Sequence, residues 1–116
     1  MNKIELTGRL TAAPELRTTT SGTSVTEFTI AVDRIGDKKT DFIRCTAYNR
    51  NADNLCKYKT KGDLIAVVGS LRVDKYKDKN GVEKYKNYVS VAEIEYLGGK
   101  AAEPTNEQTA EDDFPF

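Results

Sequence analysis

Residues 69–91, GSLRVDKYKDKNGVEKYKNYVSV, carry the local signal that most restricts the fold. Asn80-Gly81 lies within this stretch. The dipeptide is the strongest short-range indication of a two-residue β-turn, because both residues tolerate the positive φ that a type I′ turn needs. The stretch is therefore predicted to form an antiparallel hairpin, in which a two-residue turn pairs Lys79 with Val82.

That register fixes what each face of the hairpin carries. Tyr76 would lie opposite Tyr85 on one face, with Arg72 further along it. On the other face lysine would stand opposite lysine, Lys75 against Lys86 and Lys77 against Lys84. Like charges directly opposite one another destabilise a ladder, so this pairing favours a polyanion lying along the hairpin. Aromatic rings beside a basic track are what single-stranded nucleic acid needs.

Two alternatives stay open for the hairpin. In the first it is a solvated edge hairpin, whose lysines serve only to prevent aggregation. In the second the turn has three residues, which would shift the register and break both lysine pairings.

Five segments predict five short strands, four of them by alternating apolar and polar residues and the fourth in chain order by a nearly continuous apolar run that leads into the hairpin. The segments are residues 2–10, 25–32, 41–48, 64–73 and 88–97. Gly8 inside the first segment indicates a bulge or a sharp bend. Residues 51–60 are the helix candidate, with Asn51 as N-cap and a stripe of Ala52, Leu55 and Cys56. Five short strands with one helix between the third and the fourth predict an all-β fold, the five-stranded Greek-key barrel called the OB-fold.

The third predicted strand carries aromatic rings on its outer face. Ile43, Cys45 and Ala47 would face inward, so Phe42, Arg44, Thr46 and Tyr48 would face outward. Large rings are more often buried, but rotating the strand would bury Arg44 unpaired between them, which is costly. OB-folds bind oligonucleotides on this part of the barrel. The predicted contacts to single-stranded nucleic acid are Arg9, Phe42, Arg44, Tyr48, Arg72, Lys75, Tyr76, Lys77, Lys84, Tyr85 and Lys86.

The formal net charge of the 116 residues is zero, but the charge is unevenly distributed. Residues 1–98 hold 17 Lys and Arg against 13 Asp and Glu, a net charge of +4. Residues 99–116 hold Lys100 against five acidic residues, a net charge of −4, with no periodicity and little apolar content. We therefore expect an OB-fold domain over residues 1–98 and a disordered acidic tail over residues 99–116.

Composition also excludes several classes of protein. No apolar run approaches the roughly 18 residues of a membrane span, and no signal-peptide core follows the start, so a cytoplasmic protein is expected. Two cysteines and no histidine argue against a disulfide framework, a zinc site and a Ser-His or Cys-His nucleophile. We expect no metal and no other cofactor.

Three kinds of function fit an OB-fold with these residues. The favoured one is a non-catalytic nucleic-acid-binding protein. The second is a protein-interaction module, whose outer aromatic residues would bury against another protein. The third is a small nuclease, which usually needs clustered carboxylates for a metal. Asp33, Asp37 and Asp41 are spaced by four, but Lys38 and Lys39 lie among them, so an enzyme is disfavoured.

Several segments of the chain resemble bacterial and phage single-stranded DNA-binding proteins. They are NKIELTGRLTAAPELR, SGT, FTIAV, DFIRCTAY, ADNLCKYKTKGD, VGSLRVDKYKDKNG and the terminal DDFPF. The resemblance implies an OB-fold that assembles as a homotetramer and binds single-stranded DNA without sequence preference. It also implies that an acidic C-terminal tip recruits replication, recombination and repair proteins, in the bacterial cytoplasm or nucleoid, or in the host cytoplasm for a phage protein.

The resemblance also assigns roles to residues. The stacking aromatics of the family fall on Phe42, Tyr48 and Tyr76, and Tyr85 takes a position that is often aromatic. This chain departs from the family in having no Trp, a short loop at residues 33–40 and a short tail with Phe114 in place of an aliphatic residue. The partner-binding tip falls on Asp112, Asp113, Phe114, Pro115 and Phe116.

Overall fold

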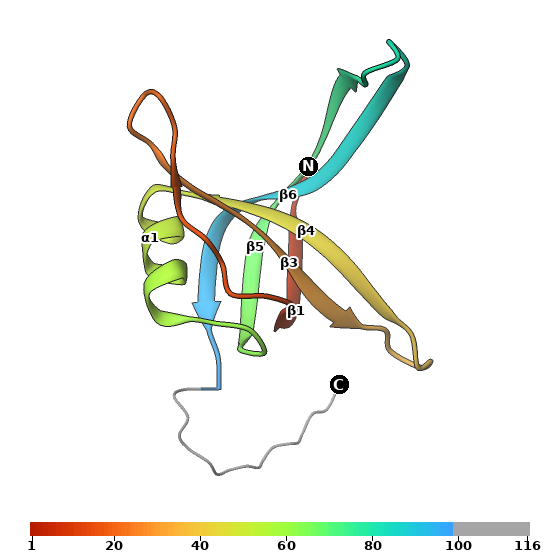
Figure 1. Ribbon diagram of the computed structural model, residues 1–116. Coiled ribbons are helices and arrows are strands. Elements are labelled where there is room, and N and C mark those ends of the chain that lie inside the picture. Colours follow the sequence, from red (N-terminus) through yellow and green to blue (C-terminus); the bar gives the residue numbers. More distant parts are fainter. Residues whose placement is uncertain (99–116) are drawn as a thin grey trace.

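A computed structural model describes residues 1–98, which form a closed β-barrel with one helix packed against it (Figure 1). The elements in chain order are β1 (Ile4–Leu10), β2 (Arg17–Thr18), β3 (Ser24–Asp33), β4 (Thr40–Tyr48), α1 (Asn49–Tyr58), β5 (Leu64–Lys77) and β6 (Glu83–Tyr96). The sheet order is β1-β5-β6-β4-β3-β2, and β1 also pairs with β3. The five long strands therefore close into the predicted OB-fold, with β2 as a short addition to β3.

The barrel closes directly after Gly8, at Arg9 and Leu10. Residues 4–9 of β1 pair with β5, whereas Arg9 and Leu10 pair with β3. A Cβ at Gly8 would lie 2.5 Å from the carbonyl oxygen of Ala31 on β3. The glycine expected to mark a bend therefore lies where β1 passes from one neighbour to the other and must approach β3 closely.

The core consists of inward-facing residues from the strands and of two residues from α1. Its members are Leu10, Phe28, Ile30, Cys45, Ala47, Ala52, Leu55, Ile65, Val67, Val89 and Val91. The inward faces predicted from alternation in β3 and β4 are thereby confirmed. Both cysteines are free, and burial raises the pKa of the Cys45 thiol to about 12.

Helix α1 lies two residues earlier than predicted, and Asn51 is not its N-cap. The side-chain amide of Asn51 instead donates a hydrogen bond to the carbonyl oxygen of Ala92 at 3.1 Å, which ties the start of the helix to β6. Ala52 and Leu55 are buried, as their spacing predicts. In the part of the chain described here, no helix has the length and apolar character to cross a membrane.

The hairpin of β5 and β6 projects beyond the barrel (Figure 1), and its register differs from the predicted one. Lys77 pairs with Glu83, so residues 78–82 form the loop. Asp78 shapes this loop, because its Oδ1 accepts hydrogen bonds from the backbone N–H groups of Asn80 at 2.9 Å and Val82 at 3.0 Å. These bonds lower the pKa of Asp78. The two-residue turn is therefore wrong, and so is the pairing of Lys79 with Val82.

The register shift exchanges the partners along the hairpin. Tyr76 lies opposite Lys84, Lys75 opposite Tyr85, and Asp74 opposite Lys86. The predicted pairs Tyr76–Tyr85, Lys75–Lys86 and Lys77–Lys84 are wrong, and no two lysines of the hairpin are paired directly. Because side chains alternate between faces, Tyr76 and Tyr85 now lie on opposite faces. The hairpin therefore has no repulsive ladder of lysines, and that argument for a bound polyanion is lost.

Candidate nucleic-acid interface

The outward face of β4 carries exposed aromatic rings. Phe42 is 69% exposed and Tyr48 is 37% exposed, and Arg44 between them is exposed as well. Their partners on β3 are smaller: Phe42 pairs with Ala31 and Arg44 with Thr29. The outward placement of the rings is confirmed, although Thr46 on the same face is buried.

Arg9 belongs to the same surface. It pairs with Ala31 on β3, which in turn pairs with Phe42 on β4. This row across three strands puts the backbones of Arg9 and Phe42 about 10 Å apart. The Nη1 of Arg9 donates to the carbonyl oxygen of Gly62 at 3.0 Å, which anchors the guanidinium near one end of the barrel.

Strands β6 and β5 continue this face into the hairpin. Cys45 of β4 pairs with Val89 of β6, and both point inward. One residue earlier in each strand, Arg44 and Tyr88 are on the opposite, outward side. Tyr88 pairs with Arg72, and Tyr76 follows on the same side of β5 with 48% exposure. The predicted sharing of one face by Tyr76 and Arg72 is therefore confirmed. We call this surface, carrying Arg9, Phe42, Arg44, Tyr48, Arg72, Tyr76 and Tyr88, the outward surface.

Two of the predicted lysines lie on the outward surface, and each contacts a carboxylate. The Nζ of Lys84 lies 3.5 Å from Oδ2 of Asp78, and the Nζ of Lys86 lies 3.3 Å from Oε2 of Glu27. Glu27 also contacts Arg17 at 3.6 Å. Exposed pairs of this kind are weak, so a phosphate can compete for these cations.

The remaining predicted contacts lie on the other face of the hairpin. Lys75, Lys77 and Tyr85 share that face with two apolar residues, Leu71 and Val73. Tyr85 is 62% exposed, Val73 56% and Leu71 43%. The structure therefore divides the predicted hairpin contacts between two surfaces. The predicted tip, Asp112 to Phe116, lies outside the described residues.

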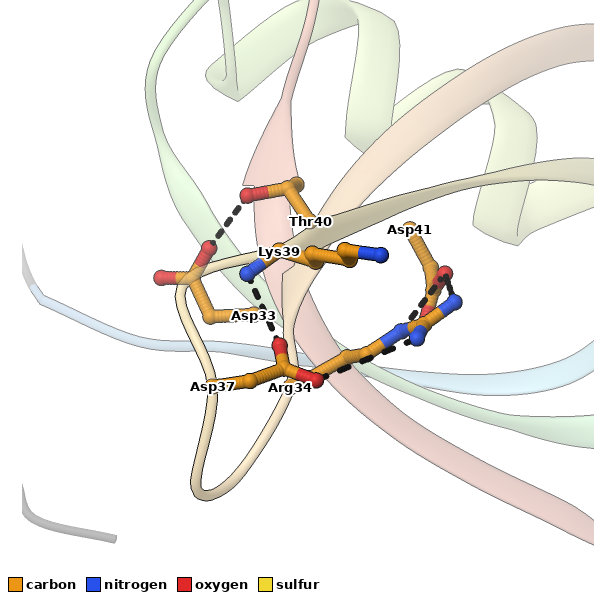
Figure 2. Close-up of polar contacts among 6 residues, drawn as sticks. All are labelled: Asp33, Arg34, Asp37, Lys39, Thr40 and Asp41. Carbon is orange, nitrogen blue, oxygen red and sulfur yellow. Dashed lines mark hydrogen bonds and ion pairs between the residues drawn. The ribbon is translucent and has the colours of Figure 1, made fainter.

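The loop between β3 and β4 has a polar network of its own (Figure 2). The guanidinium of Arg34 donates to the carboxylate of Asp41, with Nη2 2.9 Å from Oδ1 and Nε 3.1 Å from Oδ2. It also lies 3.9 Å from Asp37, while Asp33 accepts a hydrogen bond from Thr40 at 2.9 Å. The bond from Arg34 lowers the pKa of Asp41. These carboxylates are thus engaged by the loop itself, and no group of Cys, Asp and Glu within residues 1–98 is placed to hold a metal ion.

Tyr88 is the residue of this surface that sequence reasoning missed. Its Oη donates to Oδ2 of Asp74 at 2.9 Å, and this hydrogen bond raises the pKa of Tyr88. In the predicted register with a two-residue turn, Tyr88 would have lain on the face of the hairpin that carries the paired lysines. Only the true register, in which Tyr88 pairs with Arg72, places Tyr88 on the outward surface.

A closed barrel with exposed rings and arginines on β4 and the neighbouring hairpin defines an oligonucleotide-binding protein of the OB-fold class. Within that class the chain belongs to the single-strand binding protein family, whose family model matches residues 1–97. The predicted family resemblance is thereby confirmed.

Curated relatives agree with this assignment. The chain is 37% identical over 119 residues to the single-stranded DNA-binding protein 1 of Staphylococcus aureus (strain COL), covering 98% of this chain and 71% of the relative. It is 38% identical over 112 residues to the single-stranded DNA-binding protein of S. aureus (strain MRSA252), covering 92% and 72%. It is 40% identical over 99 residues to that of Clostridium perfringens (strain 13 / Type A), covering 84% and 66%.

Proposed function

We propose that this protein binds single-stranded DNA through the outward surface, as a non-catalytic binding protein. Family membership supports the activity. The exposure of Phe42 and Tyr48 beside Arg44 is the observation that supports the surface, because rings of this size are normally buried. Each base that stacks on a ring contributes about 1–3 kcal/mol, and every base has a π-face, so binding needs no particular sequence.

The phosphates find their partners among the cations of the same surface. Arg9, Arg44 and Arg72 lie among the rings, and Lys84 and Lys86 exchange their carboxylate partners for phosphate oxygens. Lys75, Lys77 and Tyr85 remain proposed contacts. A single strand reaches them only where it passes around the edge of the hairpin, because they lie on its other face.

The protein also acts through partners in this proposal. It assembles as a homotetramer, for which the exposed apolar residues Leu71 and Val73 offer a surface for subunit contact. The acidic tip, Asp112 to Phe116, binds replication, recombination and repair proteins in the cytoplasm. Its charges repel DNA, whereas its two phenylalanines suit a pocket with an apolar floor and a basic rim.

A titration of intrinsic tyrosine fluorescence with poly(dT) tests the function. We expect saturable binding, with a log–log slope against salt near −0.7 for each phosphate neutralised. A mixed-sequence oligonucleotide of equal length should bind with a similar salt slope. Absence of binding, or binding to one sequence alone, would refute the proposal.

Two further measurements test the partner assignments. Light scattering at micromolar concentration should give a tetramer, and a monomer would refute the assembly. Deleting residues 111–116 should abolish binding to DNA-processing proteins and leave DNA affinity unchanged or slightly higher, most visibly at low salt. Weaker DNA binding after this deletion would contradict the role given to the tip.

A further inference from the structure

Tyr88 occupies a gap in the run of aromatic residues across the outward surface. Tyr48 lies two residues beyond the Thr46–Ser90 pair, level with residue 92 of β6, and Tyr76 pairs with Lys84. Measured along β6, Tyr88 lies four residues, or about 13 Å, from each of these levels. Phe42 lies between these levels on the neighbouring strand β4, but on β5 and β6 Tyr88 is the aromatic residue of the outward surface between them.

The ring of Tyr88 is fixed in direction by its hydroxyl group. Asp74 accepts the hydrogen bond at 2.9 Å, and Asp74 lies two residues from Arg72 towards the loop. The ring therefore leans along the hairpin towards Tyr76. Tyr48 and Arg72 are close enough to influence the pKa of Tyr88, in addition to the larger effect of Asp74. A ring held in this way loses little conformational freedom when a base stacks on it.

A cation covers the Tyr88 ring. The Nζ of Lys86 lies 5.5 Å from the ring centroid, and the same Nζ lies 3.3 Å from Oε2 of Glu27. Lys86 is therefore held over the ring from two sides, by the π-face beneath it and by a carboxylate from β3. The pair with Glu27 is largely exposed and hence weak, and a phosphate oxygen is an equivalent partner for the ammonium group.

We propose that Tyr88 is a further base-stacking site for single-stranded DNA, covered by Lys86 in the free protein and opened when a phosphate replaces Glu27 as the partner of Lys86. The inference rests on the proposed function and adds a contact to the same surface. The base takes the place of the ammonium group over the ring, and Lys86 stays beside it as the phosphate's counterion. Tyr48, Tyr88 and Tyr76 then form a continuous series of stacking positions.

Photocross-linking tests this contact in the unaltered protein. A poly(dT) oligonucleotide that carries 5-iododeoxyuridine is bound, irradiated and mapped by mass spectrometry. Cross-links at Tyr88, in addition to Tyr48 and Tyr76, are expected. Cross-links at Tyr48 and Tyr76 without Tyr88 would overturn the inference and leave the proposed function intact. A protein that binds no oligonucleotide would overturn both.

Substitutions measure how much Tyr88 contributes to the affinity for poly(dT). Tyr88→Leu should weaken poly(dT) binding about tenfold, within the range that one stacked base contributes. Tyr88→Phe, which keeps the ring and loses only the bond to Asp74, should recover most of this loss. Tyr58→Leu is the matched control, because Tyr58 is an exposed tyrosine on α1 with the Nζ of Lys57 5.2 Å from its ring centroid. A folded Tyr88→Leu protein with unchanged affinity would overturn the inference, and cross-linking decides if that variant does not fold.

Glu27→Gln tests the covering of the ring by Lys86. Removing any acidic residue near DNA raises affinity through net charge alone, so the informative quantity is the coupling with Tyr88. Glu27→Gln should raise affinity more in the unaltered background than in the Tyr88→Leu background, where no ring is left to uncover. Equal gains in both backgrounds would show that Glu27 acts only through its charge, and would overturn the covered state.

Discussion

Gly69 should be among the least replaceable residues of the chain. It pairs with Val91 at the point where the register of β5 and β6 shifts, just before the hairpin leaves the barrel. A Cβ at this position would lie 2.9 Å from the carbonyl carbon of Ser90 and 3.1 Å from the Cα of Val91, and closer still to the carbonyl oxygen of Ser90. All three are backbone atoms, so rotating a side chain cannot relieve the contact.

The cost of Gly69→Ala follows from that geometry. Overpacking a filled site costs about 1–3 kcal/mol, and displacing the backbone of β6 weakens at least one ladder hydrogen bond, at about 0.5–1.5 kcal/mol. We therefore expect the free energy of unfolding to fall by about 2–4 kcal/mol. For a domain of this size the corresponding fall in Tm is on the order of 10–25 °C.

Urea unfolding followed by circular dichroism measures the change. Gly22→Ala is the control, because Gly22 has a φ of 87° and a Cβ there would meet nothing within 4 Å. This substitution costs only the free energy of placing alanine in the left-handed backbone conformation, about 1–2 kcal/mol. If Gly69→Ala destabilises the protein no more than Gly22→Ala, the close approach of β6 is not what requires glycine at position 69, and the reasoning is refuted.

The remaining predictions concern DNA and pH. Tyr48→Ala and Tyr76→Ala should each weaken single-stranded DNA binding by about 1–3 kcal/mol with little change in the urea midpoint; a variant that unfolds would show that its ring belongs to the core. Arg72→Gln should flatten the log–log salt dependence of poly(dT) affinity by about 0.7, and an unchanged slope would exclude Arg72 as a phosphate contact. Because Arg34 lowers the folded-state pKa of Asp41, their contact stabilises the protein above the unfolded-state pKa, and this contribution is lost as pH falls through the folded-state value. Asp41→Asn should remove that part of the acid dependence in urea titrations from neutral to low pH, and parallel curves for the two proteins would contradict it.

The apolar patterns of five strands, together with a helix between the third and the fourth, were sufficient to predict the barrel. Phe28 and Ile30 of β3, and Cys45 and Ala47 of β4, are buried as expected, because period-two patterns report directly on which face meets the core. The start of α1 was misplaced for a different reason. Asn51 has the local character of an N-cap, but its amide bonds to Ala92, 41 positions away, and no local pattern reveals such a contact.

The hairpin shows where a strong local signal misleads. Asn80-Gly81 does mark the turn, and Gly81 has the expected positive φ of 77°. Asp78, two residues before Asn80, captures the loop's N–H groups and enlarges it. The lysine-against-lysine pairs were themselves an argument against the two-residue turn, since the true register lets Lys75 contact Glu83 at 3.0 Å.

The contrast between the two cysteines has a practical consequence for anyone who wishes to follow this protein in solution. Only a thiolate reacts with maleimides, and with a pKa near 12 the buried Cys45 stays protonated at neutral pH. Cys56 is partly exposed on α1, an element that contributes no residue to the outward surface. The native chain thus provides one selective attachment point for a fluorophore. The protein can be labelled there for single-molecule experiments on DNA binding, without adding or removing a cysteine.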